Sequence, residues 1–564
     1  MISKIKNTIK EYNLDGYIVP KNDEFFTEYS RINNLQILAN FNGSAGFALI
    51  LKNSNHLFVD GRYTLQAKKQ SGKKFIIHEI PYLWPKNILK KKNKKLNIGF
   101  DPKLFTNTTL IKYFEDSCNL TPINKNLFNF KKDNLKKENF IYKIDNKVIG
   151  ESAESKIKRV VKFLRKEKID NLFISSGENV CWLLNIRGKD LPNSPVINCQ
   201  AFLSNKGKIY LFVDIRKLKI VNNYLRNKKI NFFEPKRFFS VISSIKTNTC
   251  VVDSQTCSVF NESLIKSCFK IKRIPDPIYN FKSIKNKTEI NNMIKAHIED
   301  GIALTKFLYW IKNTNIKNLD EIKVEKKLES FRKKNKNYLY PSFGTIAGSG
   351  SNGAIIHYRS NKNTNRKLNQ KELLLVDSGG QYKWGTTDVT RTISFSKPIK
   401  KIKELYTRVL KGHIAVSLSK IEKIKNGHNI DKVARKSLNS VNLDYRHGTG
   451  HGVGFFMNVH EGPQSISKNN YVELKKGMIV SNEPGYYLEN KFGIRIENLV
   501  YIDAIKNKLF FKNLTFAPLE KDLIEEKLLT KLEKNYVFNY HLETYSKISP
   551  FLKKKEKKWM ASLI

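Results

Sequence analysis

The chain has 564 residues, and its 102 Lys and Arg against 51 Asp and Glu give a formal net charge of +51. This length predicts two to four domains with sizeable cores. Six Cys without a C-x-x-C pair predict reduced thiols and argue against a disulfide framework. The N-terminus lacks the apolar core of a signal peptide, and no apolar run approaches the ~18 residues of a membrane span. We therefore expect a cytoplasmic protein with no membrane partner.

The positive charge is spread along the chain. Lys supplies most of it and is mixed with Asn and Ile throughout, which indicates a chain-wide amino-acid bias and no specific nucleic-acid partner. Two local Lys runs, at residues 90–95 and 553–558, are interpreted as solvated faces or a frayed tail. A moderate, salt-dependent affinity for polyanions is expected as a side effect.

In chain order, the first two segments repeat one plan. A strand-like stretch at residues 16–20 precedes Phe58-Val-Asp-Gly-Arg62, and a second at residues 171–175 precedes Phe212-Val-Asp-Ile-Arg216. Helical stretches such as residues 154–166 alternate with the strands. We therefore predict two copies of one α/β unit.

Linkers are expected where charge runs or prolines interrupt this pattern. The Lys- and Asn-rich residues 129–138 and the Pro-Asp-Pro at residues 275–277 are the best candidates. The predicted domains of this α/β (α+β) chain are 1–135, 140–280 and 284–564.

The third segment opens with a predicted helix at residues 288–312. Thr288 is the expected N-cap, and His297 lies on the apolar stripe, so we interpret it as a core or helix-face histidine. His541 is interpreted as structural, packing the final helix. The same structural interpretation holds for the histidines without a chemical constellation, which are His56, His78, His413 and His428.

The chemistry is carried by four carboxylates and one imidazole, Asp377, Asp388, Glu483, Glu497 and His451, which lie next to or within two residues of Gly or a β-branched residue. An oxygen-rich set with one nitrogen suits hard or borderline divalent ions and argues against a thiolate or four-coordinate structural zinc site. Two divalent cations would balance the four negative charges. A single ion would leave excess negative charge in a cavity, which is costly.

The local patterns explain how these groups converge. An apolar run ends in Asp377, and the alternation around Asp388 predicts a second strand facing the first. The segments that contain Glu483 and Glu497 repeat this pair of strand patterns. Arg495 shares a strand face with Glu497, so it can hydrogen-bond a ligating carboxylate.

One further histidine, His447, lies four residues before His451. Both lie in a Gly-rich segment that is a poor helix former, so we place them on a strand or loop.

These motifs resemble the pita-bread metallopeptidases, and in detail the aminopeptidase P family in its long three-domain form. All five metal-ligand positions of the family are matched. The resemblance extends to Gly353-Ala-Ile-Ile-His-Tyr358, Asn458-Val-His-Glu-Gly-Pro463 and Leu514-Thr-Phe-Ala-Pro-Leu519. It implies two creatinase-like N-terminal domains, a pita-bread catalytic domain, two divalent ions (most often Mn²⁺) and a homodimer.

The resemblance also assigns roles to the ligand set. Asp388 and Glu497 would bridge the ions, with Asp377 on one and His451 and Glu483 on the other. Glu483 would serve as general base as well. Two metals about 3.5–4 Å apart can share a water and lower its pKa, which gives a hydroxide nucleophile.

Other residues would surround the substrate. His357 and His460 would bind it and stabilise the transition state, and His447 would support proton movement or leaving-group contacts. Arg62, together with Arg495, would contact the substrate side of the site. A salt bridge at a domain interface is the alternative reading of Arg62.

The implied activity is release of the residue that precedes a proline at position two. A proline at position two has no backbone N–H, a group to which many peptide-binding sites hydrogen-bond. The specificity for proline is implied by the resemblance alone. The alternatives are an Xaa-Pro dipeptidase of prolidase type and a non-catalytic peptide- or nucleic-acid-binding module; metal-free creatinase chemistry is disfavoured by the ligands. Trp384 departs from the family pattern, in a predicted hairpin turn, where we expect altered surface or substrate-channel contacts.

Overall fold

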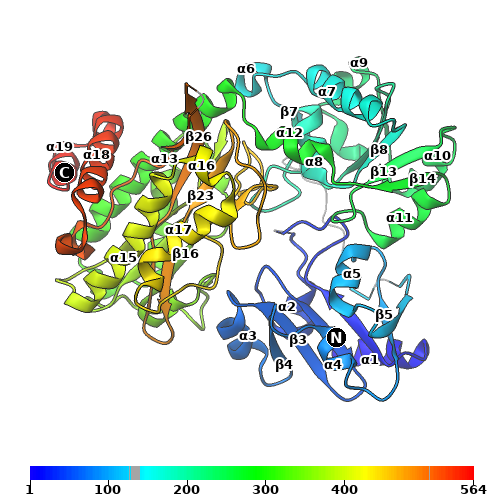
Figure 1. Ribbon diagram of the computed structural model, residues 1–564, viewed down its shortest axis with the longest axis horizontal. Helices are drawn as coiled ribbons and strands as arrows, with labels where there is room; N and C mark the ends of the chain where they lie inside the picture. The colour runs from blue at the N-terminus through cyan, green and yellow to red at the C-terminus, as the bar shows by residue number, and fades with distance from the viewer. Residues whose placement is uncertain (29, 126, 129–139, 507) are drawn as a thin grey trace. The chain divides into compact units, whose positions relative to one another are not determined.

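The computed structural model describes the whole chain except residues 29, 126, 129–139 and 507. The predicted linker at residues 129–138 therefore lies outside the described residues. The chain divides into two compact units, Met1–Tyr279 and Asn280–Ile564 (Figure 1). This division falls just after Pro-Asp-Pro277, while the three predicted domain boundaries stay predictions.

Unit 1 contains two six-stranded sheets. The first has the order β4-β3-β2-β1-β5-β6, in which β1 pairs antiparallel with β2 and parallel with β5. Its strands are β1 Gly16–Pro20, β2 Phe47–Leu51, β3 Asn55–Asp60, β4 Ile76–Ile80, β5 Leu96–Phe100 and β6 Cys118–Pro122. The main helices beside it are α1 Ile2–Glu11, α2 Asn34–Ala39, α3 Thr64–Ser71 and α5 Asn107–Phe114.

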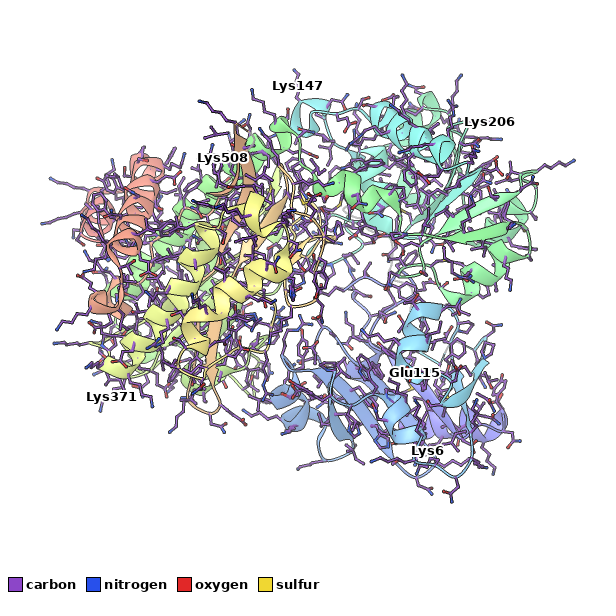
Figure 2. The ribbon with its side chains drawn as sticks, in the orientation of Figure 1. Lys6, Glu115, Lys147, Lys206, Lys371 and Lys508 are labelled. Atoms are coloured by element: carbon purple, nitrogen blue, oxygen red, sulfur yellow. The ribbon has the colours of Figure 1, made fainter. Side chains whose placement is uncertain are left out.

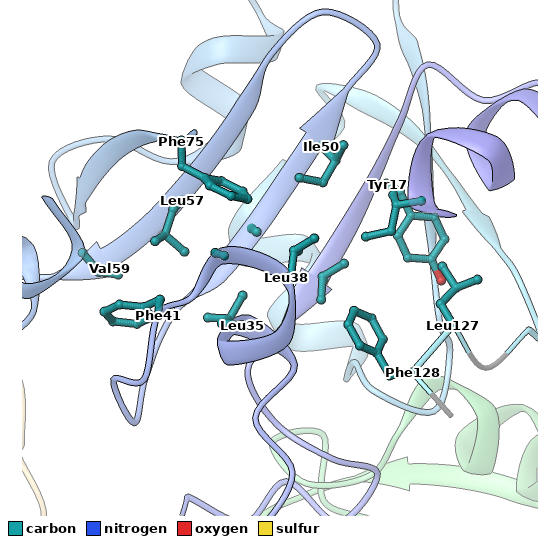
Figure 3. Close-up of a cluster of buried hydrophobic side chains, with 14 of the residues drawn as sticks. Tyr17, Leu35, Leu38, Phe41, Ile50, Leu57, Val59, Phe75, Leu127 and Phe128 are labelled. Carbon is teal, nitrogen blue, oxygen red and sulfur yellow. The ribbon is translucent and has the colours of Figure 1, made fainter. Parts of the chain in front are cut away.

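One apolar core of this first copy lies where α2 faces the sheet. Figure 3 shows Leu35 and Leu38 of α2 beside Ile50 of β2 and Leu57 of β3, all of them buried. Aliphatic and aromatic burial of this kind contributes about 1.5–3 kcal/mol per side chain. Such packing is a main contribution to the stability of this copy.

The second sheet repeats the first. Its order is β12-β11-β10-β8-β13-β14, and β8 again pairs antiparallel with one neighbour and parallel with the other. The strands are β8 Asn171–Ile174, β10 Gln200–Ser204, β11 Ile209–Phe212, β12 Ile230–Phe233, β13 Thr249–Val252 and β14 Lys270–Arg273, with helices α7 Ala153–Lys166, α8 Gly177–Leu184 and α11 Val259–Lys266. The predicted repeat of one α/β unit is confirmed.

Unit 2 begins with helix α13, Lys287–Asn313. The predicted N-cap, Thr288, is wrong: Asn286 caps the helix, and its side chain and that of Glu289 form a reciprocal capping box. Two donors are satisfied together in this way, which a cap at Thr288 cannot achieve because no Glu or Gln lies three residues after it. The other main helices are α14 Glu321–Arg332, α15 Lys400–Ser417, α17 Gly427–Asn439, α18 Lys531–Ile548 and α19 Lys554–Ala561.

Two three-stranded antiparallel sheets of unit 2, called the ladders below, provide the strands that matter for the site. The first sheet has the order β16-β17-β20 and the second β23-β26-β27. Each ladder has a short hairpin inserted between its paired strands, β18–β19 in the first and β24–β25 in the second. The strands are β16 Ile346–Ser349, β17 Leu374–Ser378, β18 Gly380–Tyr382, β19 Gly385–Thr386, β20 Val389–Ile393, β23 Ile479–Asn482, β24 Gly485–Leu488, β25 Phe492–Arg495, β26 Asn498–Ile505 and β27 Lys508–Asn513.

Several structural interpretations are confirmed. His297 is buried with Nδ1 2.8 Å from the Met293 carbonyl, and His541 accepts a hydrogen bond from the Leu519 N–H at 3.1 Å. All six cysteines are free thiols in the described chain. Among the helices that the structure describes, none is both long and apolar enough to cross a membrane.

The lysines lie mostly on the surface. In Figure 2, labelled lysines such as Lys206 in unit 1 and Lys371 in unit 2 project outward from the ribbon. The residues of the run at 90–95 are all exposed, and the run at residues 553–558 forms the first turns of α19 with most of its lysines exposed. Both are solvated faces, as expected.

Candidate active site

The four carboxylates come from the ends of the paired strands in unit 2. Asp377 lies in β17 opposite Thr390 of β20, and Asp388 directly precedes β20. Glu483 directly follows β23, and Glu497 directly precedes β26. The predicted facing arms are confirmed for both pairs, although each pair is interrupted by an inserted hairpin that the sequence pattern did not predict.

The two ladders are joined beside the carboxylates by Thr390. Its carbonyl accepts from the Glu497 N–H at 3.1 Å, and its hydroxyl donates to Glu497 Oε2 at 2.7 Å. Thr392 adds a second link by donating to the Arg495 carbonyl at 3.0 Å. Sequence reasoning missed this role of Thr390, although its place two residues after Asp388 was a signal that the two share a strand face.

His451 brings the imidazole to these carboxylates from the short strand β21, Gly450–His451, as the Gly-rich context predicted. Its Nε2 lies 3.4 Å from Asp388 Oδ2 and 3.5 Å from Glu483 Oε1. Its Nδ1 lies 3.0 Å from the Gly452 carbonyl, which assigns the proton to Nδ1. The lone pair of Nε2 therefore faces the carboxylates, as in a metal-ligating histidine whose other nitrogen is hydrogen-bonded.

The donor set fits divalent cations. One ligand atom from each of Asp388, His451 and Glu497 lies within 4.8 Å of the others. Within the described residues, Oδ1 of Asp377 and Oδ1 of Asp388 are buried without a hydrogen-bond partner. Burial and the neighbouring carboxylates raise the pKa of Asp388 and of Glu497 well above its usual value. A pair of hard cations would bind the carboxylate oxygens that lack hydrogen bonds and would offset the crowded negative charge.

Arg495 is the buried counter-charge. Its Nη2 donates to Asp377 Oδ2 at 2.7 Å, so the predicted contact with a ligating carboxylate exists, but it is made with Asp377 of the other ladder. The four carboxylates and this guanidinium sum to −3. Two divalent cations would overcompensate that charge by one, and a single cation would leave −1. Charge balance alone therefore does not choose between one ion and two.

Tyr487, on β24, connects Arg495 to His447. Arg495 Nη1 lies 2.7 Å from the Tyr487 hydroxyl oxygen, which lies 2.9 Å from His447 Nε2. His447 Nδ1 lies 2.7 Å from the Gly448 carbonyl, so Nε2 accepts from the phenol. Burial raises the pKa of Tyr487 to about 12, which keeps the phenol protonated. No pattern in the sequence pointed to Tyr487.

The other two histidines also lie in unit 2. The ring of His460 is nearly perpendicular to that of His451, with centroids 4.2 Å apart. His357 follows the 3-10 helix Gly350–Ala354, and the preceding carbonyl, that of Ile356, lies 3.5 Å from Arg495 Nη1. The structure thus brings His460 directly against the carboxylate–imidazole cluster and the His357 turn against its guanidinium.

Arg62 lies in unit 1. Its Nε and Nη2 donate to the two oxygens of Asp60 at 2.9 and 2.8 Å, and its guanidinium lies 5.3 Å from the Tyr63 ring centroid. The expected approach of Arg62 to the substrate stays a prediction. Trp384 occupies the turn between β18 and β19, as predicted, and its indole nitrogen is buried without a hydrogen-bond partner among the described residues.

Comparison with known families covers nearly the whole chain. Metallopeptidase family M24 matches residues 291–504, and the C-terminal region of peptidase M24 matches residues 507–563. The creatinase/prolidase N-terminal domain matches twice, at residues 1–126 and 133–289.

Two Xaa-Pro aminopeptidases are similar over nearly the full length of this chain, and a prolidase over about two thirds of it. Xaa-Pro aminopeptidase 1 of Dictyostelium discoideum is 35% identical, over 98% of this chain and 93% of the relative. The solved X-prolyl aminopeptidase of Caenorhabditis elegans, described as a cytosolic enzyme with a di-nuclear active site, superposes with a TM-score of 0.93 at 28% identity, over 100% and 98% of the two chains. The prolidase of Pyrococcus horikoshii reaches a TM-score of 0.53 at 25% identity, over 65% of this chain and 99% of its own.

Proposed function

Since the chain belongs to metallopeptidase family M24 and, within it, to the Xaa-Pro aminopeptidases, we propose that it is a metal-dependent exopeptidase. It hydrolyses the first peptide bond of peptides that carry proline at the second position. The observation that carries the proposal is the convergence of Asp388, His451 and Glu497, whose ligand atoms lie within 4.8 Å, beside the buried Asp377 and the half-buried Glu483. Full-length similarity to X-prolyl aminopeptidases supports the choice of substrate class.

The five ligand residues proposed for two divalent ions are Asp377, Asp388, His451, Glu483 and Glu497. When bound, such ions lower the pKa of a water and polarise the scissile carbonyl. We propose Mn²⁺ as the metal, because oxygen-rich sets accept it readily, although availability also decides between first-row ions. The M24 family and the di-nuclear relative support two ions.

The chain's own residues would move protons and orient the substrate. Glu483 Oε1 accepts from the Ser481 hydroxyl at 3.0 Å, which holds the carboxylate in place as the proposed general base. The ring of His460 packs against that of His451, and His460 and His357 would donate to a developing oxyanion.

His447 has a separate role in this proposal. Its Nε2 accepts from Tyr487, so the imidazole is held neutral in one tautomer and can receive a proton when the phenol moves. We propose that the free α-amine of a peptide lies near individual carboxylates of this cluster, which would favour release of the first residue over internal cleavage.

Prolidase activity, restricted to dipeptides, is the second candidate. The solved prolidase accounts for only 65% of this chain, whereas the X-prolyl aminopeptidase accounts for all of it. This chain also carries two creatinase/prolidase N-terminal matches, at residues 1–126 and 133–289. A non-catalytic binding module has no need to keep four carboxylates together.

We also propose a cytoplasmic location, supported by free buried thiols and by the cytosolic relative. A homodimer, by contrast, is proposed on family resemblance alone. The distributed lysines imply no specific nucleic-acid partner.

The test measures release of the first residue from Arg-Pro-Pro and from Ala-Pro after chelation and Mn²⁺ add-back. Wild type and Glu483→Gln are compared, with Glu473→Gln as a control, since Glu473 is an exposed acid of the same unit. Metal-dependent cleavage of the tripeptide that is lost only in Glu483→Gln is expected. Cleavage of the dipeptide alone would favour prolidase, and no cleavage with metal bound would favour the binding module.

A further inference from the structure

A buried ion cluster lies next in sequence to His460. Glu461 Oε1 is 2.9 Å from Lys285 Nζ, and Glu461 Oε2 is 3.3 Å from Lys282 Nζ. The side chains are almost completely buried, at 1% exposure for each lysine and 2% for the glutamate. Each carboxylate oxygen therefore has its own ammonium group, and we refer to these three residues as the lysine clamp.

The clamp is costly to bury. Two ammonium groups against one carboxylate leave a net charge of +1, and each buried ion carries a desolvation penalty of several kcal/mol. Burial alone would raise the pKa of Glu461, but Lys282 and Lys285 hold it below its usual value. A single lysine would suffice for neutrality. The second one fixes the other oxygen, so the carboxylate cannot rotate.

The backbone of Glu461 leads directly to His451. The Glu461 N–H donates to the Gly452 carbonyl at 2.8 Å. The same carbonyl lies 3.0 Å from His451 Nδ1, the hydrogen bond that aims Nε2 at the carboxylates. Gly454 makes room for the clamp, because a Cβ there would lie 2.7 Å from Glu461 Oε2.

The other end of this loop is fixed separately. Gln381 Nε2 donates to the Met457 carbonyl at 2.8 Å, and the Met457 N–H donates to the Thr386 hydroxyl at 3.2 Å. His460 therefore lies between two anchors, one on the β18–β19 hairpin and one in the lysine clamp. Downstream of His460, the loop is held by the Glu461 N–H on the Gly452 carbonyl and by the Glu461 side chain in the lysine clamp.

We propose that Lys282 and Lys285 act, through Glu461, as positioning residues that set the orientation of His451 and His460. The inference rests on the proposed function for its catalytic readout, but its effect on the metal site is independent of the peptide substrate. Both lysines act on the loop, and groups that orient a ligating histidine typically change metal affinity or activity by about 10–100-fold when they are removed.

The central variant is Lys285→Met, which keeps the length of the side chain and leaves a neutral Lys282–Glu461 pair. We expect the Mn²⁺ affinity of the metal-free protein, measured by calorimetry, to fall about 10-fold. On Arg-Pro-Pro, kcat should fall by about the same factor while KM changes much less, because ground-state binding is retained. Lys282→Met should act in the same direction, and Lys285→Arg, which keeps the charge, should recover most of both losses.

Lys411→Met is the matched control. Lys411 is a partly buried lysine of unit 2 whose ammonium group binds Glu533 and the Leu528 carbonyl. It should lose thermal stability with unchanged metal affinity and kcat. Wild-type metal affinity and kcat in Lys285→Met, with only a lower Tm, would overturn the proposal and leave the clamp a purely structural element.

The outcomes separate the two claims. A wild-type chain that binds Mn²⁺ but cleaves neither peptide would refute the proposed function. The Mn²⁺ affinities of the lysine variants would still test the positioning role of Lys282 and Lys285. Should Lys285→Met not fold, Lys285→Arg and Lys282→Met decide it: wild-type metal affinity and kcat in Lys282→Met would count against the clamp.

Discussion

Both units of this chain repeat a structural plan, but they differ in where they place charge. In unit 1 the two sheets share strand order, and each carries an Asp-x-Arg pair after an equivalent strand, with Arg62 28% and Arg216 62% exposed. In unit 2 the two ladders each deliver two carboxylates to one buried region, where Arg495 is the neighbouring counter-charge. A repeated fold therefore does not by itself indicate a functional site, whereas buried charge that the protein does not neutralise does indicate one.

The Asp-x-Arg pairs illustrate the first half of that lesson. Arg216 and Asp214 make the same fork as Arg62 and Asp60, at 2.9 and 2.7 Å. The pairing is thus a property of the α/β unit and cannot by itself mark a substrate contact. What distinguishes Arg62 is its lower exposure and its contact with Tyr63.

The largest expected effect is that of Glu497→Gln. Removal of the charge from a proposed bridging ligand should lower kcat/KM on Arg-Pro-Pro by on the order of 10³-fold, because charge stabilisation and activation of water are lost together. Arg216→Ala, which removes the unit 1 charge with no proposed role, should leave kcat/KM at the wild-type value. Comparable activity in the two variants would break the contrast between the units.

Arg495→Lys should cost less, about 100-fold in metal affinity or kcat/KM. Lysine keeps the positive charge, but it cannot bind Asp377 and Tyr487 at once as the planar guanidinium does. Tyr487→Phe is the matched comparison, since it removes the contact to His447 and leaves the Arg495–Asp377 pair intact. Full activity of Arg495→Lys at saturating Mn²⁺ would show that charge alone is required.

A smaller effect concerns stability at acid pH. Burial lowers the pKa of His541 to about 4, so between pH 6.5 and 4 the unfolded chain binds a proton that the folded chain does not. Stability therefore falls as the pH drops, by about 2 kcal/mol for this group between pH 7 and 5. Chemical unfolding at both pH values should show that the free energy of unfolding of His541→Gln falls less between pH 7 and 5 than that of the wild type, by about 2 kcal/mol. An identical pH dependence would mean that His541 accepts its proton in the folded state.

The smallest effect sharpens the comparison within unit 1. Arg62→Ala should lower kcat/KM on the tripeptide by about 10-fold, the scale of one charge-assisted contact, and should affect Ala-Pro less. Arg216→Ala again serves as the control. Equal values of kcat/KM for both variants and the wild type would show that Arg62 has only a structural role, in its ion pair with Asp60.

Much of the site was predictable because its signals are local. An apolar run that ends in Asp377, and glycines around His451, restrict the backbone without reference to distant residues. The α13 cap was predicted wrongly although Asn286-x-x-Glu289 was present in the sequence; the Glu three residues later is what selects Asn286 over Thr288.

Tyr487, Thr390 and the lysine clamp belong to another category. Their roles depend on contacts between segments far apart in the sequence, such as Lys285 with Glu461, and a single sequence carries no signal of such a pairing. The inserted hairpins escaped notice because the pairing of β17 with β20 spans them.

The most direct test titrates the metal-free protein with Mn²⁺ and follows heat and Arg-Pro-Pro cleavage in the same samples. We expect two ions per chain in wild type, full activity only when both are bound, and fewer than two in Glu497→Gln. Full activity with one ion or none, or two ions bound in Glu497→Gln with wild-type affinity, would contradict the two-ion site built from the paired ladders.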